Sequence, residues 1–502
     1  MKIYQELINI VTKHKRNNIK VIGLDKGQNA NQYDSLYTVL EEHPDISFDE
    51  CRDLFFPPNK NKQFTNLLGG FKRRLVNALF LIDAKKSPYG TVKDAHFNTW
   101  KNLAASKILV RFYAFTAAED IIKQTLPHSI ATENFLVSSE LYRMLGKFAG
   151  RRGDLKSSSS YFESYQDQID KHLSYSTACQ LHLELHVQIA NVKSAPDQFG
   201  PLANDYLRKI EKILETNSLD RIWVYYYHIA YFYLAIEKKP VKIIELMEDG
   251  IARLRASKAV DKEIVGAFHH LLLINQAVLG LFEESIKTFK SSEDFVAAGS
   301  LNWFISRESA CLIFLYYGSY NDALNLYMTT TSHRSFKSLF PTKRENWVLI
   351  EAFLQLLLLT EKLTYSGDKK LKKFSLARFT NEVIINNKDK QGFNVTFQIL
   401  QILFLLYQKK WSLAEDKIMA IYKYTQRHFE LEETDRTVCF VMALTQLPRG
   451  GFSQLEVKKR SAEWLEKMQA IPPMQTTDPF EVEVIPYQKL WDIAIESLPV
   501  SH

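Results

Sequence analysis

Glycine and proline are scarce in this chain, with 18 glycines and 15 prolines among 502 residues. Glycine allows tight turns and proline ends helices, so their scarcity favours long helices joined by short connections. The composition is 46% hydrophobic, 24% charged and 13% aromatic. These proportions are typical of a folded globular protein and exclude a disordered or collagen-like chain.

Cysteine is also rare, and the cysteines lie more than a hundred residues apart, at Cys51, Cys179, Cys311 and Cys439. This spacing indicates reduced, buried side chains rather than a disulfide or zinc framework. No apolar run approaches the roughly 20 residues of a membrane helix. The first residues lack the apolar core of a secretory signal. We therefore expect a soluble cytoplasmic protein without a membrane segment.

Catalytic motifs are missing as well. No G-x-S-x-G, kinase or Rossmann pattern occurs, and the glycines of segment 146–154 lack the strand and the Lys-Ser or Lys-Thr of a phosphate loop. His182 and His186 share a helical face but have no third ligand nearby in the sequence, so we interpret them as packed or solvated side chains. We predict that the chain is not an enzyme and holds neither a metal nor another cofactor.

Helical periodicity dominates the sequence, and a sequence motif recurs from residue 94 onward. An apolar helix is followed by a Gly-x-aromatic-x-x-small turn and then by a second helix. The instances begin at Gly153, Gly280 and Gly318, with degenerate ones at Lys239 and Lys409. We expect glycine to adopt the left-handed conformation and the small residue to let the two helices approach closely. The spacing of about 40 residues predicts one helical hairpin per repeat.

The segment from Tyr317 to Leu324, with Tyr327 after it, resembles the opening of the second helix in the tetratricopeptide-repeat family. The resemblance covers residues 94–470. The period exceeds the family's usual length of about 34 residues, and most of the characteristic Trp and Pro positions are absent. The resemblance implies an all-α fold, a right-handed superhelical solenoid of antiparallel helical hairpins, and a partner protein or peptide bound on the solenoid surface.

The two ends of the chain differ from the repeats. We predict a basic helical unit over residues 1–90, the solenoid over 91–470 and a proline-punctuated cap over 471–502. In the first unit, a capping box at Ser47 predicts a helix that begins at Phe48 and ends before Pro57. An apolar stripe from Phe64 to Ile82 predicts a long amphipathic helix over residues 61–83.

The net charge of +7 is unevenly distributed: residues 52–90 carry an excess of six positive charges. The layout resembles, loosely, the helix-turn-helix head of bacterial regulators that carry tetratricopeptide repeats. This layout indicates five candidate residues for nucleic-acid binding, which are Lys60, Lys62, Lys72, Arg73 and Arg74. A basic face that only aids solubility is the interpretation that we favour. A second cluster, residues 368–390 with an excess of four, is interpreted as an exposed loop and helix start.

Aromatic residues crowd the segment from Trp223 to Tyr233. Packing between repeats explains such a run, and we favour that interpretation. The alternative is a peptide-binding groove lined by Tyr225, Tyr226, Tyr227 and Tyr231.

These observations predict a non-enzymatic scaffold or adaptor for a protein or peptide partner. Two alternatives remain open: a nucleic-acid-binding transcriptional regulator, and a structural subunit of a larger defence or secretion complex. The sequence identifies neither the partner nor the oligomeric state.

Overall fold

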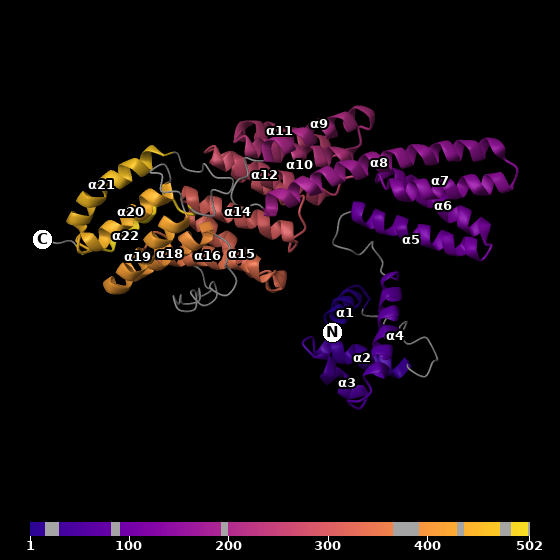
Figure 1. The fold of residues 1–502 in the computed structure, drawn as a ribbon, viewed down its shortest axis with the longest axis horizontal. Coiled ribbons are helices and arrows are strands. Elements are labelled where there is room, and N and C mark those ends of the chain that lie inside the picture. Colours follow the sequence, from indigo (N-terminus) through magenta and orange to yellow (C-terminus); the bar gives the residue numbers. More distant parts are fainter. Residues whose placement is uncertain are drawn as a thin grey trace. The chain divides into compact units, whose positions relative to one another are not determined.

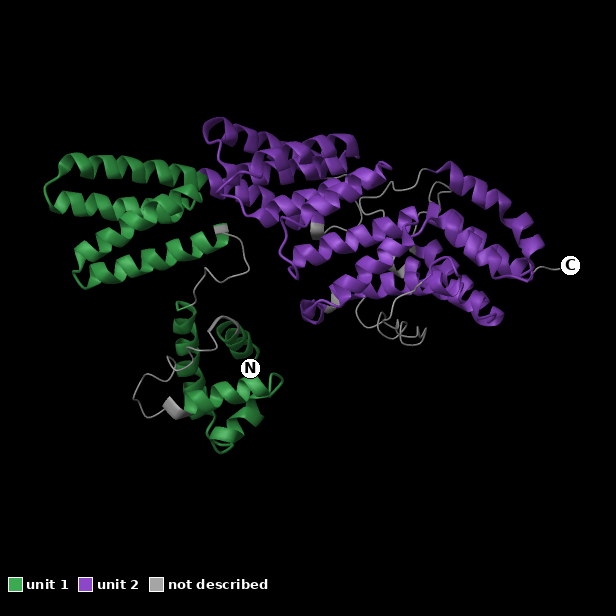
Figure 2. Ribbon diagram, turned by 180° about the vertical axis from the view of Figure 1, so that it is seen from behind, with its two compact units in different colours: residues 1–173 green, residues 174–502 purple. Residues whose placement is uncertain are grey.

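The computed structural model describes residues 1–15, 30–81, 91–191, 199–364, 391–428, 436–471 and 483–499, which fold into helices joined by turns. No strand occurs in these ranges (Figure 1). The predicted all-α class is therefore confirmed. The chain forms two compact units, Met1–Leu173 and Ser174–His502 (Figure 2). The predicted boundaries after residues 90 and 470 adjoin ranges outside this description and stay predictions.

The first unit contains α1 (Lys2–Lys15), α2 (Ala30–Glu42), α3 (Phe48–Phe55), α4 (Asn61–Leu79), α5 (Thr91–Arg111), α6 (Phe115–Ala131), α7 (Phe135–Arg151) and the first part of α8 (Leu155–Asn191). The second unit holds the rest of α8 and then α9 (Gly200–Thr216), α10 (Asp220–Ile236), α11 (Pro240–Leu254), α12 (Lys262–Val278), α13 (Phe282–Ser292), α14 (Leu301–Tyr317), α15 (Tyr320–Thr331), the 3-10 helix η4 (Arg334–Ser338), α16 (Pro341–Leu359), α18 (Gln391–Tyr407), α19 (Trp411–His428), α20 (Arg436–Arg449), α21 (Gln454–Ala470) and α22 (Tyr487–Glu496).

Helices α1 to α4 share one hydrophobic core. The predicted stripe of α4 supplies Phe64, Phe71 and Leu75, which are fully buried. Phe71 stacks on Tyr33 of α2 with ring centroids 6.1 Å apart. The predicted capping box is confirmed, because the Ser47 hydroxyl accepts from the Glu50 amide and the Glu50 carboxylate accepts from the Ser47 amide.

One turn geometry recurs along the chain. At nine helix ends a backbone amide donates to the carbonyl five residues earlier, and the residue before the donor has a positive φ of 51° to 86°. This is the Schellman closure of a helix. The left-handed residues are Tyr113, Glu133, Gly153, Lys238, Gly280, Gly318, Glu361, Lys409 and Gly451.

The predicted role of glycine is confirmed at Gly153, Gly280 and Gly318. The degenerate instance at Lys239 was placed one residue too late, because Lys238 is the left-handed residue. The turns at Tyr113 and Glu133 were not predicted, since neither residue usually adopts left-handed backbone. There the closing hydrogen bonds and helix packing must offset a backbone cost of about 1 kcal/mol.

The small residue of the recurring sequence motif lies where the paired helices meet. Five residues after the left-handed position, five of the nine turns carry a fully buried alanine or serine. These are Ala118, Ser138, Ser285, Ala323 and Ala414. A larger side chain at these positions would push the two helices of a hairpin apart. Of the three predicted glycine turns, those at Gly280 and Gly318 are followed by such a buried residue, whereas Ser158 after Gly153 is half-buried.

Candidate functional site

The predicted basic residues of the first unit fall into two groups. Lys60, Lys62, Lys72 and Arg73 are exposed, and none of them forms an ion pair with a described residue. Arg74 is half-buried, and its guanidinium carbon lies 4.3 Å from the ring centroid of Tyr33. This cation–π contact joins α4 to α2, so Arg74 contributes to packing.

Arg52, which contributes to the basic excess of this segment, is neutralised inside the unit. It is 7% exposed and pairs with Asp53 at 2.8 Å and with Asp49. A further hydrogen bond of 2.7 Å, from Nη1 to Oδ1 of Asn61, joins α3 to the start of α4. Arg52 therefore orients α4 but does not add to its basic face.

Two adjacent glycines in α4 have different surroundings. A side chain at Gly70 would collide with the hydroxyl group of Tyr33, which explains glycine there. A Cβ at Gly69 would meet nothing within 4 Å. Gly69 is exposed beside the basic face. Packing therefore does not explain why glycine, a poor helix former, occupies this position in the helix. Exposed backbone of this kind lets a ligand approach the helix closely.

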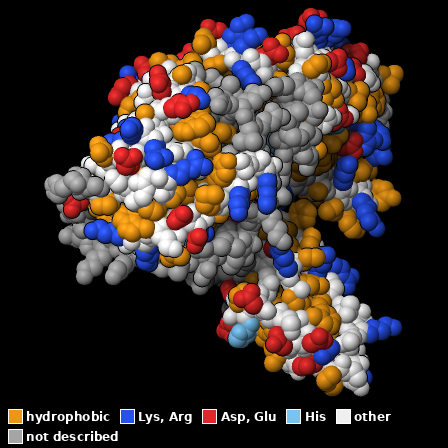
Figure 3. Space-filling view, turned by 60° about the vertical axis from the view of Figure 1, so that its left-hand side comes forward, with side chains coloured by type: hydrophobic (Ala, Val, Ile, Leu, Met, Phe, Trp, Pro, Cys, Tyr) orange, Lys and Arg blue, Asp and Glu red, His pale blue; other side chains and the backbone are white. Residues whose placement is uncertain are grey.

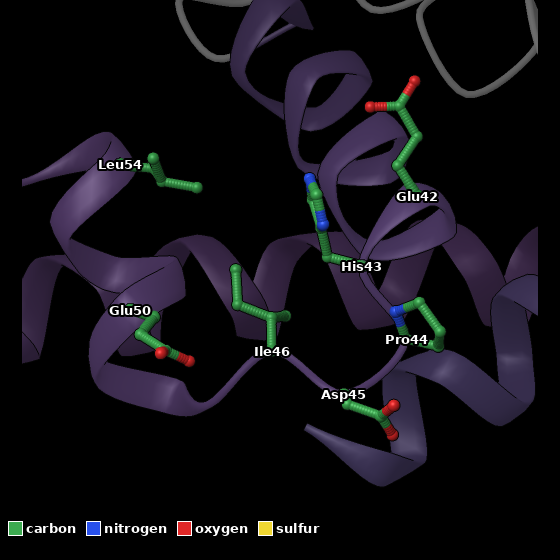
Figure 4. A pocket seen from close by; sticks show the side chains of 7 residues that line it. All are labelled: Glu42, His43, Pro44, Asp45, Ile46, Glu50 and Leu54. Carbon is green, nitrogen blue, oxygen red and sulfur yellow. The ribbon is translucent and has the colours of Figure 1, made fainter.

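The α2–α3 turn of the same unit is acidic. A depression of about 560 Å³ is lined there by Ile46, Leu54, His43, Pro44 and three carboxylates, those of Glu42, Asp45 and Glu50 (Figure 4). The Glu50 carboxylate already accepts from the Ser47 amide at 2.9 Å. The negative charge makes this turn unsuitable for phosphate.

The tyrosines proposed for a peptide groove are partly or fully covered in α10. Tyr227 is fully buried and donates its hydroxyl to Asp249 of α11. A ligand could reach it only if this core opened, so it is a packing residue. Tyr226 is half-buried against Trp223, with ring centroids 5.1 Å apart. Tyr231 is half-buried beside the core shared by α10, α11 and α12.

Tyr225 lies in a ladder that joins the aromatic run to the two histidines of α8. Its ring centroid is 5.7 Å from that of Tyr175 and 5.4 Å from that of His182. His182 also lies 5.1 Å from His228, and His186 lies 6.0 Å from Phe232. Helical spacing on both helices brings these residues together, but only the packing of α8 on α10 reveals His228 as their neighbour.

Burial keeps the inner histidines of this ladder neutral. It lowers the pKa of His182 to about 4, and it does the same for His228. His186 is exposed at the edge of the ladder. Among the described residues no group of three or more His, Cys, Asp or Glu side chains is arranged to hold a metal ion. The surface therefore offers aromatic faces, tyrosine hydroxyls and imidazole nitrogens, which suit a polypeptide partner.

Charges of both signs are mixed on the face drawn in Figure 3. Lys85, Lys86 and the whole of the second basic cluster, residues 368–390, lie outside the described residues. None of the helices in the described ranges is both long and apolar enough to cross a bilayer. No protein-family model matches the chain, and neither a curated protein nor a solved structure matches it.

Proposed function

We propose that the chain is a non-enzymatic scaffold whose helical hairpins form a right-handed, tetratricopeptide-like solenoid that binds a partner protein or peptide. The supporting observation is the recurring Schellman turn, followed at most turns by a small buried residue. A hairpin of this kind buries one face internally and needs neighbouring hairpins to cover the rest. The proposal assigns no catalytic residue and no cofactor to the chain.

The ladder on α8 and α10 is the proposed binding surface. It combines exposed His186 with half-buried Tyr225 and Tyr231. The Tyr225 and Tyr175 hydroxyl oxygens lie 3.1 Å apart, and the Tyr175 oxygen also accepts from Arg221, so these contacts hold the two rings in place. Half-buried aromatic rings lose little conformational entropy on binding, which favours their use as anchors.

The test is affinity purification of the full chain from its native cell, with mass spectrometry and a nucleic-acid assay of the eluate. We expect a stoichiometric protein partner that a Tyr225→Ser/His186→Ala variant loses. Leu413→Ala is the control, because Leu413 is exposed on α19 and is not part of the ladder. If no partner is recovered, or if both variants retain it equally, the proposed surface is wrong. Recovery of a large fixed assembly would instead favour a structural subunit.

The specific observation favouring a second function, nucleic-acid binding, is that Lys62, Lys72 and Arg73 of α4 are exposed and form no ion pair with a described residue. The first turns of α4 also expose Gln63, Thr65 and Asn66, whose side chains can hydrogen-bond to bases or phosphates. Binding should weaken steeply with salt, with a slope near 0.9 per phosphate contacted.

Fluorescence anisotropy with duplex DNA and single-stranded RNA tests this second function. The informative variant is Lys62→Glu/Lys72→Glu/Arg73→Glu, which leaves the Arg74–Tyr33 contact intact. The control reverses three exposed lysines of the second unit, Lys417, Lys423 and Lys459. Loss of affinity only in the α4 variant supports the function. Unchanged affinity for both nucleic acids excludes it.

A further inference from the structure

A small depression lies between α11 and α13, with α12 beneath it. Its volume is about 320 Å³, near the lower limit of about 300–1,000 Å³ for small-molecule sites. Its polar lining comes from all three helices: Glu248, Arg255, His269, Lys287, Thr288 and Ser291. The apolar side chains of Ile251 and Leu272 complete the wall.

His269 in this depression has unused hydrogen-bonding capacity. Its side chain is 8% exposed, and neither ring nitrogen has a hydrogen-bond partner among the described residues. One side of the ring packs against Phe295, with centroids 5.1 Å apart. Burial and the nearby Arg255 charge lower the pKa of His269 to about 4, so the imidazole is neutral at pH 7. A neutral imidazole offers one donor and one acceptor, and burying both unpaired disfavours the empty site.

Two cations approach the depression from opposite helices. Arg255, which caps the C-terminus of α11, and Lys287 of α13 are exposed, and neither forms an ion pair with a described residue. The Ser291 hydroxyl is exposed on the same side as Lys287 and can donate a further hydrogen bond. Thr288 already donates to Oε1 of Gln276 at 2.8 Å, which leaves its oxygen as an acceptor.

We propose that this depression binds a small molecule carrying a phosphate monoester, with the phosphate between Arg255 and Lys287 and the His269 N–H donating to it. Donors from three helices match a tetrahedral anion better than a planar carboxylate, which a single arginine can satisfy. The Glu248 carboxylate also lines the depression and can accept a hydrogen bond from a hydroxyl or amino group on the rest of the ligand. This inference is independent of the proposed scaffold function.

Isothermal titration of the full chain with glycerol 3-phosphate tests the proposal, with inorganic phosphate as competitor and acetate at equal ionic strength as control. We expect saturable binding that inorganic phosphate displaces and acetate does not reproduce. Arg255→Gln/Lys287→Gln should weaken it at least tenfold, because both charge-assisted hydrogen bonds are lost. Lys242→Gln/Lys290→Gln removes the same charge from exposed positions of α11 and α13 outside the lining, and should leave affinity unchanged.

A His269→Phe variant, which retains a buried ring without nitrogens, should weaken binding about tenfold. Because it alters the core, thermal unfolding must first show that it folds. If His269→Phe does not fold, the Arg255→Gln/Lys287→Gln variant still tests the proposal, because both of its substitutions are at exposed positions. The proposal is overturned if wild-type protein shows no saturable binding, if the two lysine controls weaken it equally, or if acetate binds as tightly.

Discussion

His182 of α8 and His228 of α10 pack ring against ring, with centroids 5.1 Å apart, and burial lowers the pKa of each to about 4. The ordinary value for histidine is 6.5. Neither ring can become protonated in the folded state without bringing charge into a poorly solvated site next to the other. The contact between α8 and α10 is therefore sensitive to acid.

The first prediction concerns stability and pH. Between pH 6.5 and 4 the unfolded chain binds protons at these histidines and the folded chain does not, so the free energy of unfolding should fall as pH falls through this window. Above pH 6.5 both histidines are neutral in the folded and the unfolded chain, so they no longer make the free energy of unfolding depend on pH. Urea midpoints at pH 8, 7, 6 and 5, followed by tryptophan fluorescence, measure the effect. His182→Phe/His228→Phe should reduce the acid slope, to which His269 also contributes, and an unchanged slope would contradict the assignment.

The second prediction exchanges residues at equivalent turns. Lys238 and Gly280 both have left-handed backbone, with φ of 54° and 80°. Lys238→Gly removes strain and should stabilise the second unit by up to about 1 kcal/mol, whereas Gly280→Ala should destabilise it by about 1 kcal/mol. A Cβ at Gly280 meets nothing within 4 Å, so the loss would come from the backbone alone. Chemical denaturation measures both variants, and changes of the same sign would refute the common geometry.

The third prediction separates the two glycines of α4. Gly69→Ala should stabilise the helix by about 1 kcal/mol through helix propensity. Gly70→Ala should destabilise it because Tyr33 occupies the space that its methyl group needs. Hydrogen exchange of α4 amides in the full chain should slow in the first variant and accelerate in the second. Equal protection in both would show that Tyr33 does not hold α4 as described.

The fourth prediction concerns a buried ion pair near the carboxyl end. Arg436 of α20 donates to both carboxylate oxygens of Glu483, at 3.0 and 2.9 Å, and to the carbonyls of Met468 and Ile471. Arg436→Met leaves a carboxylate buried without its cation and should cost about 3–5 kcal/mol. The double variant Arg436→Met/Glu483→Gln should recover part of this loss. Urea denaturation measures the change, and a midpoint equal to that of the wild type would contradict the prediction.

Local patterns account for much of the predicted fold. The capping box at Ser47 and the stripe from Phe64 predicted helices that the structure confirms, because both depend on residues three to seven positions apart. Glycine at positions 153, 280 and 318 identified three turns for the same reason. Turns at Tyr113 and Glu133 escaped prediction because their left-handed backbone is enforced by packing rather than by residue type.

The candidate sites were less predictable, since they depend on pairs distant in the chain. The sequence predicted Arg74 as one of the nucleic-acid-binding cations. In the structure its guanidinium lies over the ring of Tyr33 on another helix, so Arg74 contributes to packing. His182 gave no sign of meeting His228, which lies 46 residues later. The lining of the phosphate-sized depression comes from three separate helices, so no sequence motif marks it.

By itself, the sequence determined an all-helical chain with hairpin turns and locally concentrated charge, because helix periodicity, capping and glycine placement act over a single helical turn. The tertiary structure alone decided which side chains remain available. Burial withdrew Tyr227 and Arg52 from the surface. Among the described residues, helix packing left Lys62, Lys72 and Arg73 exposed and the His269 ring nitrogens without a hydrogen-bond partner. These outcomes follow from the contacts between helices, whose energies depend on distance in space rather than on position along the chain.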